Sequence, residues 1–151
     1  MSFRTQAALI VAAAALLGGL IGAAPSFLFT PDAVAADAVT DCTVVDGDTL
    51  RCVAERIRLL GIDAPELPGH CAQGRDCAPG NPFASTESLR TALTPPLRIE
   101  RVGKDRYGRT LALVAGAKGD LSCWQLAHGQ AIYKPRWDND GRLARICAAV
   151  R

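Results

Sequence analysis

Six cysteines constrain this chain more than any other feature, because all of them fall between positions 42 and 147 of a sequence of 151 residues. An even set of cysteines in a small exported domain indicates a disulfide framework, in which each bridge contributes ~2–4 kcal/mol. Nearness in sequence predicts three pairs: Cys42–Cys52, Cys71–Cys77 and Cys123–Cys147. A zinc site is the alternative, but the sequence has no CxxC pair, and His70 and His128 lie apart.

The N-terminal segment has the composition of a targeting sequence. Arg4 precedes an uncharged run at residues 7–24, and Ala33-Val34-Ala35 matches the A-x-A cleavage pattern. We therefore predict that residues 1–35 form a signal peptide and that residues 36–151 form the mature domain. An uncleaved membrane anchor is the alternative, because the apolar run is just long enough to span a bilayer. Either reading places the domain outside the cytoplasm, in the periplasm or secreted, and limits membrane contact to this segment.

Charge and composition exclude several classes of protein. From Ala36 onward, sixteen Lys and Arg residues are balanced by fourteen Asp and Glu residues. This near-neutral balance excludes a histone-like polycation and an acidic tail. Any contact with nucleic acid must therefore come from a local basic patch. Aromatic residues make up only 5% of the chain, so a core must be built from Leu, Ile and Val.

Short β-rich runs bounded by turn residues predict five strands, at residues 39–46, 48–53, 56–62, 97–102 and 110–115. Helices are expected at residues 82–93 after Asn81, at 121–128 after Asp120, and at 142–150. This order predicts an α+β fold that is mainly β. Its expected architecture is a five-stranded barrel of the OB type with two or three packed helices.

Two aspartates are expected to face each other across a hairpin. If the second and third strands turn at Glu55-Arg56, Asp48 lies opposite Asp63. Like charges opposite each other destabilise a sheet, so such a pair indicates a bound cation. Carboxylates favour a hard cation, Ca²⁺ before Mg²⁺, and a backbone carbonyl near Ala64 would complete the shell. The alternative is that both aspartates are turn residues that point to water.

A further carboxylate and two arginines accompany this pair. Arg58, Glu66 and Arg109, together with a divalent cation, form a set suited to phosphodiester hydrolysis. The cation and the guanidinium groups offset charge on the phosphate oxygens, and Glu66 orients or deprotonates the attacking water. The alternatives are that Arg58 pairs with Glu55 or Glu100 and that Arg109 is solvated.

The spacing of Arg58 and Asp63 creates a geometric difficulty. Residues five apart in a regular strand point to opposite faces of the sheet. Both side chains serve one site only if the strand is bulged or sharply coiled between them. Gly61 is the residue expected at such a bulge.

The segments VVDGDTL, RIRLLGIDAPE and DRYGRTLA, in this order and spacing, resemble the staphylococcal nuclease (thermonuclease) family. The resemblance runs from about Cys42 to Tyr133. It implies an OB-type barrel and a Ca²⁺-dependent nuclease that cleaves DNA and RNA and leaves 3′-phosphates. By the same resemblance, the calcium ligands are Asp48, Asp63 and the carbonyl of Ala64, where the best-known members have Thr. The implied general base is Glu66, and Arg58 and Arg109 contact the scissile phosphate.

The resemblance also implies residues that bind substrate. Tyr107 matches a tyrosine near the nucleotide phosphate, and Arg106 stands where a Lys is common. The tyrosine-rich segment that stacks on the base has no clear match, although Tyr133 and Trp137 are able to replace it by stacking. Packing against the end of the barrel is the alternative for both. The loop CAQGRDC is extra, and we expect it to stabilise the fold rather than to form a rim over the groove.

Nucleic acid is thus the expected partner, with single strands preferred, and no obligate protein partner is evident. Two other functions remain open. The first alternative is a non-catalytic OB-fold module that binds nucleic acid. The second alternative is an envelope domain that binds Ca²⁺ for stability only. Retention of Asp48, Arg58, Asp63, Glu66 and Arg109 together favours the enzyme.

Overall fold

The computed structural model describes residues 37–39 and 41–150 of the chain. The predicted signal peptide and the predicted start at Ala36 lie outside the described residues. Within the part that is described, no helix combines the length and the hydropathy needed to cross a bilayer.

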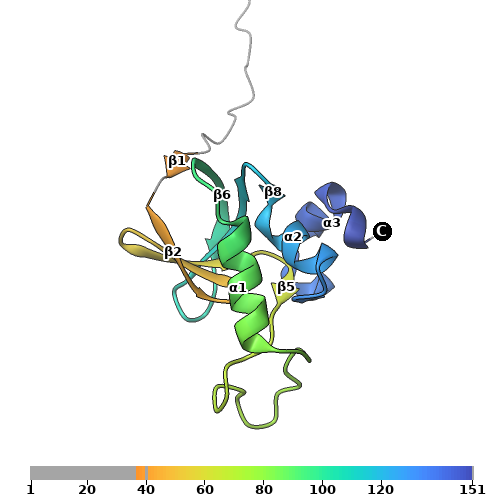
Figure 1. The fold of residues 1–151 in the computed structure, drawn as a ribbon. Helices are drawn as coiled ribbons and strands as arrows, with labels where there is room; N and C mark the ends of the chain where they lie inside the picture. Colours follow the sequence, from red (N-terminus) through yellow and green to blue (C-terminus); the bar gives the residue numbers. More distant parts are fainter. Residues whose placement is uncertain (1–36, 40, 151) are drawn as a thin grey trace, which may run out of the picture. The chain divides into compact units, whose positions relative to one another are not determined.

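Seven strands form the main sheet (Figure 1). They are β1 (Asp37–Val39), β2 (Cys42–Asp46), β3 (Thr49–Cys52), β4 (Glu55–Leu59), β6 (Leu97–Lys104), β7 (Thr110–Gly116) and β8 (Gly119–Asp120). The order is β1-β6-β7-β4-β3-β2, and β8 pairs with β7. Strands β4 and β7 run parallel, whereas the other pairs are antiparallel. A second, two-stranded sheet joins β5 (Ile62–Asp63) to β9 (Ile132–Tyr133).

The α+β class predicted from the sequence is confirmed. The five predicted strands correspond to β2, β3, β4, β6 and β7. Strands β1 and β2 are the two ends of the main path, and no pairing among the described residues joins them. The closed OB-type barrel therefore stays a prediction.

In the described part of the chain, three α-helices accompany the sheets: α1 (Pro82–Ala92), α2 (Leu121–Ala127) and α3 (Arg142–Ile146). The side chains of Asn81 and Asp120 cap α1 and α2, as expected. The third helix is shorter than predicted, because Cys147 adopts an extended conformation and a 3-10 turn follows it. Buried Asp138 supplies the N-terminal contacts of α3, accepting hydrogen bonds from the amides of Leu143 and Ala144.

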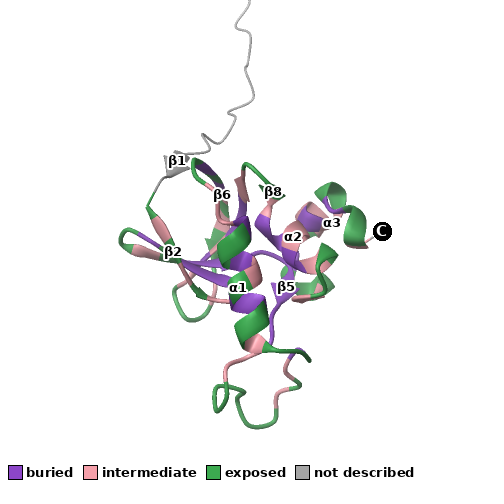
Figure 2. Ribbon diagram, viewed as in Figure 1, coloured by how far each residue is buried: buried purple, intermediate pink, exposed green. Residues whose placement is uncertain are grey.

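The core lies between the main sheet and the helices, as the buried residues in Figure 2 show. Its largest fully buried side chains are aliphatic apart from that of Gln125, which agrees with the low aromatic content of the sequence. They include Leu50, Ile57, Leu59, Leu89, Ile99, Val114, Leu121 and Leu143. Every long element of the fold thus contributes apolar area to one cluster, which makes burial the main source of its stability.

All three predicted disulfides are present. Cys42 and Cys52 are direct partners across β2 and β3. The bridge Cys123–Cys147 ties α2 to the residue that follows α3. The bridge Cys71–Cys77 closes a short loop in residues 64–81, the long connection below α1 in Figure 1.

The predicted register between the second and third strands is wrong. Thr49 pairs with Arg58, and Cys52 pairs with Glu55, so the turn falls at Val53-Ala54. Asp48 therefore does not lie opposite Asp63. Val53 has φ 51°, a left-handed conformation that β-branched residues rarely adopt, and neither turn residue is a turn former. The local sequence consequently carries no signal for this turn.

The third predicted strand is broken where a bulge was expected. Strand β4 ends at Leu59, the chain turns through Gly61 at φ 73°, and β5 begins at Ile62. A Cβ atom on Gly61 would lie 2.8 Å from a methyl carbon of Leu143, so the turn also needs the absence of a side chain. This turn resolves the geometric difficulty, because it lets Arg58 and Asp63 point into one site.

Candidate active site

Arg58 lies at the centre of the site, held between two buried aspartates. Its Nη1 atom is 2.5 Å from Asp48 Oδ1, and its Nη2 atom is 3.1 Å from Asp63 Oδ1. The two aspartates are 2% and 0% exposed, so they do not point to water as turn residues would. The two aspartates are thus brought together through a guanidinium group rather than by direct strand pairing.

The other expected partners of Arg58 are engaged elsewhere. Glu55 accepts hydrogen bonds from Arg101 and from the Thr110 hydroxyl. Glu100 accepts one from Arg142. The interpretation of Arg58 as a structural partner of Glu55 or Glu100 is therefore wrong.

The carboxylate of Asp48 accepts hydrogen bonds from a backbone amide and a hydroxyl group in addition to Arg58. Its Oδ2 atom accepts the amide of Ala64 at 2.9 Å, and its Oδ1 atom accepts the Thr49 hydroxyl at 3.1 Å. Burial raises the pKa of Asp48 to about 7, and the charge of Arg58 opposes this effect only in part. A buried carboxylate with a raised pKa gains free energy from any added positive charge nearby.

The turn that carries Asp48 is supported by hydrogen bonds from a buried glutamine. Gln125 on α2 donates from Nε2 to the carbonyl of Gly47 at 2.7 Å and to the carbonyl of Ser85 at 2.9 Å. A Cβ atom on Gly47 would lie 2.0 Å from Ser85 Oγ and 2.7 Å from Ala64 Cβ. Glycine is therefore required between the two aspartates of DGD by the close approach of α1.

Asp63 and Glu66 are joined by a residue that the sequence did not single out. Arg75 Nη2 lies 2.5 Å from Asp63 Oδ1, and Arg75 Nη1 lies 2.7 Å from Glu66 Oε1. Glu66 is 23% exposed at its side chain, whereas Asp63 is fully buried. Glu66 is thus the carboxylate of this group that solvent reaches most easily.

Trp137 and Lys134 complete this side of the site. The ring of Trp137, 40% exposed, has the cationic groups of Arg58, Arg75 and Lys134 within 5.6–5.8 Å of its centre. Lys134 Nζ lies 3.8 Å from Asp63 Oδ2. A half-exposed aromatic ring beside the guanidinium groups is able to stack on a base.

The turn between β6 and β7 presents Arg106, Tyr107 and Arg109. Asp105 accepts hydrogen bonds from the amides of Tyr107 and Arg109 and from Arg109 Nε. Although partial burial acts in the opposite direction, these bonds lower the pKa of Asp105. Tyr107 is 67% exposed, and the guanidinium groups of Arg106 and Arg109 lie 4.7 and 5.5 Å from the centre of its ring. Arg109 is therefore oriented by Asp105 rather than freely solvated.

Tyr133 is placed differently from Tyr107. It pairs with Ile62 in the small sheet, and its hydroxyl donates to Asp138 Oδ2 at 2.6 Å. This hydrogen bond raises the pKa of the Tyr133 phenol. The structure thus gives Tyr133 an internal partner, and its contact with substrate stays a prediction.

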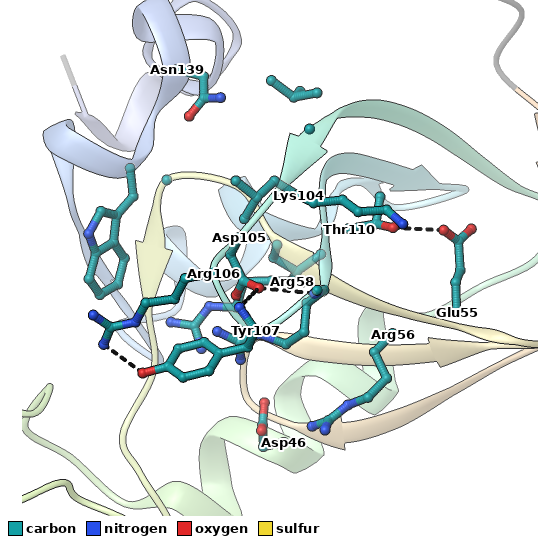
Figure 3. Close-up of a pocket in the computed structure, with 18 of the residues that line it drawn as sticks. Asp46, Glu55, Arg56, Arg58, Lys104, Asp105, Arg106, Tyr107, Thr110 and Asn139 are labelled. Carbon is teal, nitrogen blue, oxygen red and sulfur yellow. Dashed lines mark hydrogen bonds and ion pairs between the residues drawn. The ribbon is translucent and has the colours of Figure 1, made fainter.

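A groove of about 1780 Å³ runs over these residues. Figure 3 shows side chains around it from several segments, among them Arg56 and Arg58 from β4, Lys104 to Tyr107 from the end of β6 and the turn before β7, and Asn139. Its lining carries four acidic residues and nine basic ones: Arg51, Arg56, Arg58, Arg75, Arg101, Lys104, Arg106, Arg109 and Arg136. The near-neutral chain therefore does contain a local basic patch, with Glu66 in its lining and the buried Asp48 and Asp63 paired with Arg58.

The oxygen donors of three carboxylates are of the kind that a hard cation prefers, and in this structure they pair with arginines: Asp48 and Asp63 with Arg58, and Asp63 and Glu66 with Arg75. Asp63 Oδ2 is a buried carboxylate oxygen without a hydrogen-bond partner in the described structure, and Lys134 Nζ lies 3.8 Å from it. Such an orphaned oxygen is costly unless a cation or water satisfies it. Ala64 lies against Asp48 through its amide, which leaves the predicted role of its carbonyl open.

Sequence reasoning missed Arg75 and Lys134. Arg75 stands in the extra loop CAQGRDC, which we expected to act in stabilisation. Its two flanking cysteines are the signal that would have found it, because a bridge between them holds the loop in a fixed conformation. Lys134 follows Tyr133 directly, but no local pattern links it to Asp63.

No family model matches the chain. The chain is similar to succinoglycan biosynthesis protein ExoI of Rhizobium meliloti, with 35% identity over 123 residues that cover 79% of this chain and 64% of that protein. It is also similar to an uncharacterized endonuclease of Haemophilus influenzae, with 32% identity over 108 residues that cover 66% of this chain and 55% of that protein. The chain thus spans less than two thirds of the length of these curated relatives.

Proposed function

We propose that this chain is an exported, Ca²⁺-dependent nuclease of the thermonuclease type. Its substrate is DNA or RNA, preferably single-stranded, and its products carry 3′-phosphates. The observation that carries the proposal is Arg58, held between two buried aspartates beneath a basic groove that also contains Glu66 and Arg109. The similarity to a protein named as an endonuclease supports hydrolysis of nucleic acid.

The proposed reaction uses the residues as follows. Glu66 accepts a proton from a water molecule, whose oxygen attacks the phosphorus in line with the leaving group. The bond from phosphorus to the 5′-oxygen breaks, and this oxygen takes a proton from solvent, which leaves a 3′-phosphate and a 5′-hydroxyl. Arg58 and Arg109 stabilise the charge that develops on the phosphate oxygens. When bound by Asp48, Asp63 and Ala64, Ca²⁺ supplies further positive charge at the same phosphate.

Other parts of the proposal concern the fold and the compartment. The parallel contact of β4 with β7 and the antiparallel order of the remaining strands support a partly open barrel of the OB type. Three disulfides favour an oxidising compartment, which supports export.

Digestion assays test the proposal directly. The oxidised protein is incubated with single-stranded DNA, duplex DNA and RNA, with Ca²⁺ titrated against an EGTA control. We expect cleavage that requires Ca²⁺ and is fastest on single strands. Tight binding of all three nucleic acids with no cleavage at any Ca²⁺ concentration would instead favour a non-catalytic binding module.

Ca²⁺ is expected to raise the melting temperature of the wild-type protein. A ligand at about 100 times its dissociation constant adds roughly 2.7 kcal/mol to the free energy of unfolding. Asp48→Asn and Asp63→Asn should abolish most of this Ca²⁺-dependent shift, because each removes a proposed ligand charge. Differential scanning calorimetry with Ca²⁺ or EGTA measures it, and Asp41→Asn, at an exposed aspartate, is the control. An equal shift in Asp48→Asn and wild type would argue against this site.

Arg51 and Arg56 provide a test of substrate class. They are direct partners across β3 and β4, both are exposed, and neither forms an ion pair within the described residues. Like charges in this position destabilise a sheet, and both residues line the groove. A polyanion that lies along β3 and β4 would offset this repulsion.

The double variant Arg51→Gln/Arg56→Gln should reduce the salt dependence of binding to single-stranded DNA. Each lost phosphate contact lowers the slope of log K against log[salt] by about 0.7. Fluorescence anisotropy on the Glu66→Gln background, which is expected to slow cleavage, measures the slope. Arg90→Gln/Arg98→Gln removes the same charge at exposed positions outside the groove. Equal slopes for the two double variants would contradict a specific role of the hairpin.

A further inference from the structure

The loop closed by Cys71 and Cys77 lines the groove, and its residue Arg75 forms ion pairs with two carboxylates of the site. Residues 71–74 and Asp76 are exposed, whereas the side chain of Arg75 is only 34% exposed. The backbone holds Arg75 in place, because its amide donates to the carbonyl of Ala72 at 3.1 Å. The loop is thus a short closed ring that directs Arg75 toward the carboxylates.

Arg75 bridges two carboxylates of different character. It contacts Asp63, which is fully buried, at 2.5 Å and Glu66, which is partly exposed, at 2.7 Å. One guanidinium group donates to both through separate nitrogen atoms, and its planar fork fixes the angle between them. The position of Glu66, which follows β5, relative to Asp63 in β5 is therefore set by a residue of the loop that Cys71 and Cys77 close.

Arg75 contacts one oxygen of each carboxylate and leaves the other without a hydrogen bond. Asp63 Oδ2 has no hydrogen-bond partner in the described structure and lies 3.8 Å from Lys134 Nζ, and no hydrogen bond among the described residues reaches Glu66 Oε2. A guanidinium group that blocked the site would engage these atoms as well. The contacts of Arg75 therefore orient the two carboxylates and do not block the site.

We propose that Arg75 is a positioning residue that holds Glu66 beside Asp63, and that the Cys71–Cys77 bridge holds Arg75 in turn. This inference rests on the proposed role of Glu66 as the general base. A misplacement of about 1 Å in a reacting group lowers a rate by about 10²-fold, so the loss of an orienting contact acts on turnover. The extra loop then serves catalysis in addition to stability.

A double-variant comparison tests this inference. Turnover and KM on single-stranded DNA are measured for wild type, Arg75→Gln, Glu66→Gln and the double variant. We expect Arg75→Gln to lower kcat by about 10²-fold with KM nearly unchanged. In the double variant, kcat should equal that of Glu66→Gln alone, because Arg75 acts through Glu66. Arg75→Lys should recover only part of kcat, since an ammonium group does not form the same fork.

Two further measurements sharpen the comparison. Cys71→Ser/Cys77→Ser should reproduce the kcat loss of Arg75→Gln, and wild-type turnover in that variant would overturn the role of the bridge. Arg90→Gln, which removes an exposed arginine paired with Glu87, is the matched control and should retain full turnover.

Several outcomes would overturn the inference while the proposed function stands. They are wild-type kcat in Arg75→Gln, multiplicative losses in the double variant, and a raised KM with unchanged kcat, which would assign Arg75 to the substrate phosphate. Failure of the wild-type protein to cleave any substrate would instead refute the proposed function itself, and this inference with it.

Discussion

Replacement of Glu66 by Gln is expected to lower the turnover of single-stranded DNA by about 10²–10⁴-fold, the usual contribution of a general base. Gln has the same shape and is still able to accept the hydrogen bond from Arg75, but it does not take a proton from water. The melting temperature should therefore change little. Turnover is measured with an end-labelled oligonucleotide at saturating Ca²⁺.

Arg58 should be equally important, but its replacement needs a milder change. Arg58→Ala would leave Asp48 and Asp63 buried with less compensation, which costs about 3–5 kcal/mol in stability. Arg58→Lys keeps the charge and removes the planar fork, so we expect a folded protein with turnover reduced by about 10²–10³-fold. Glu87→Gln, at an exposed carboxylate on α1, is the control for both variants. Normal cleavage by Glu66→Gln and Arg58→Lys would refute the roles proposed for these residues.

Asp138→Ala is expected to give the largest loss of stability outside the groove, about 3–5 kcal/mol. Asp138 is fully buried and accepts hydrogen bonds from the amides of Leu143 and Ala144 and from the Tyr133 hydroxyl. Removal of its carboxylate leaves all three donors without this partner. Urea or thermal unfolding measures the change.

A matched pair of substitutions isolates this effect. Asp138→Asn keeps the size of the side chain but turns an NH₂ group toward one of the donors, so it should still cost about 1–3 kcal/mol. Asp140→Asn, two residues along the chain, changes an exposed carboxylate at φ 64°, a conformation that Asn tolerates. We expect that variant to be close to wild type. Equal stability of the two Asn variants would show that Asp138 does not anchor α3.

The elements that were predicted well are those with local signals. Asn81-Pro82 and Asp120 carry capping chemistry, and both helices begin where expected. The cysteine pairs were confirmed because each bridge joins cysteines that are neighbours in the sequence. Gly61 was identified from the need to bring Arg58 and Asp63 together, and its positive φ agrees with that reasoning.

The elements that were missed depend on tertiary contacts. The turn at Val53-Ala54 follows from strand pairing and lacks turn-forming residues, so the register of β3 and β4 was wrong. Arg75 reaches Asp63 from 12 residues away through an irregular loop. Lys134 approaches Asp63 only because β9 pairs with β5. The periodicity of the sequence does not predict contacts of this kind between distant segments.

The most direct measurement is the identification of the ends that the oxidised protein produces from a defined single-stranded oligonucleotide, by mass spectrometry, with Ca²⁺ and with EGTA. We expect fragments with 3′-phosphate and 5′-hydroxyl ends in Ca²⁺ and intact oligonucleotide in EGTA. Recovery of intact oligonucleotide under both conditions, from a folded protein with its three disulfides formed, would contradict the assignment of this groove to phosphodiester hydrolysis.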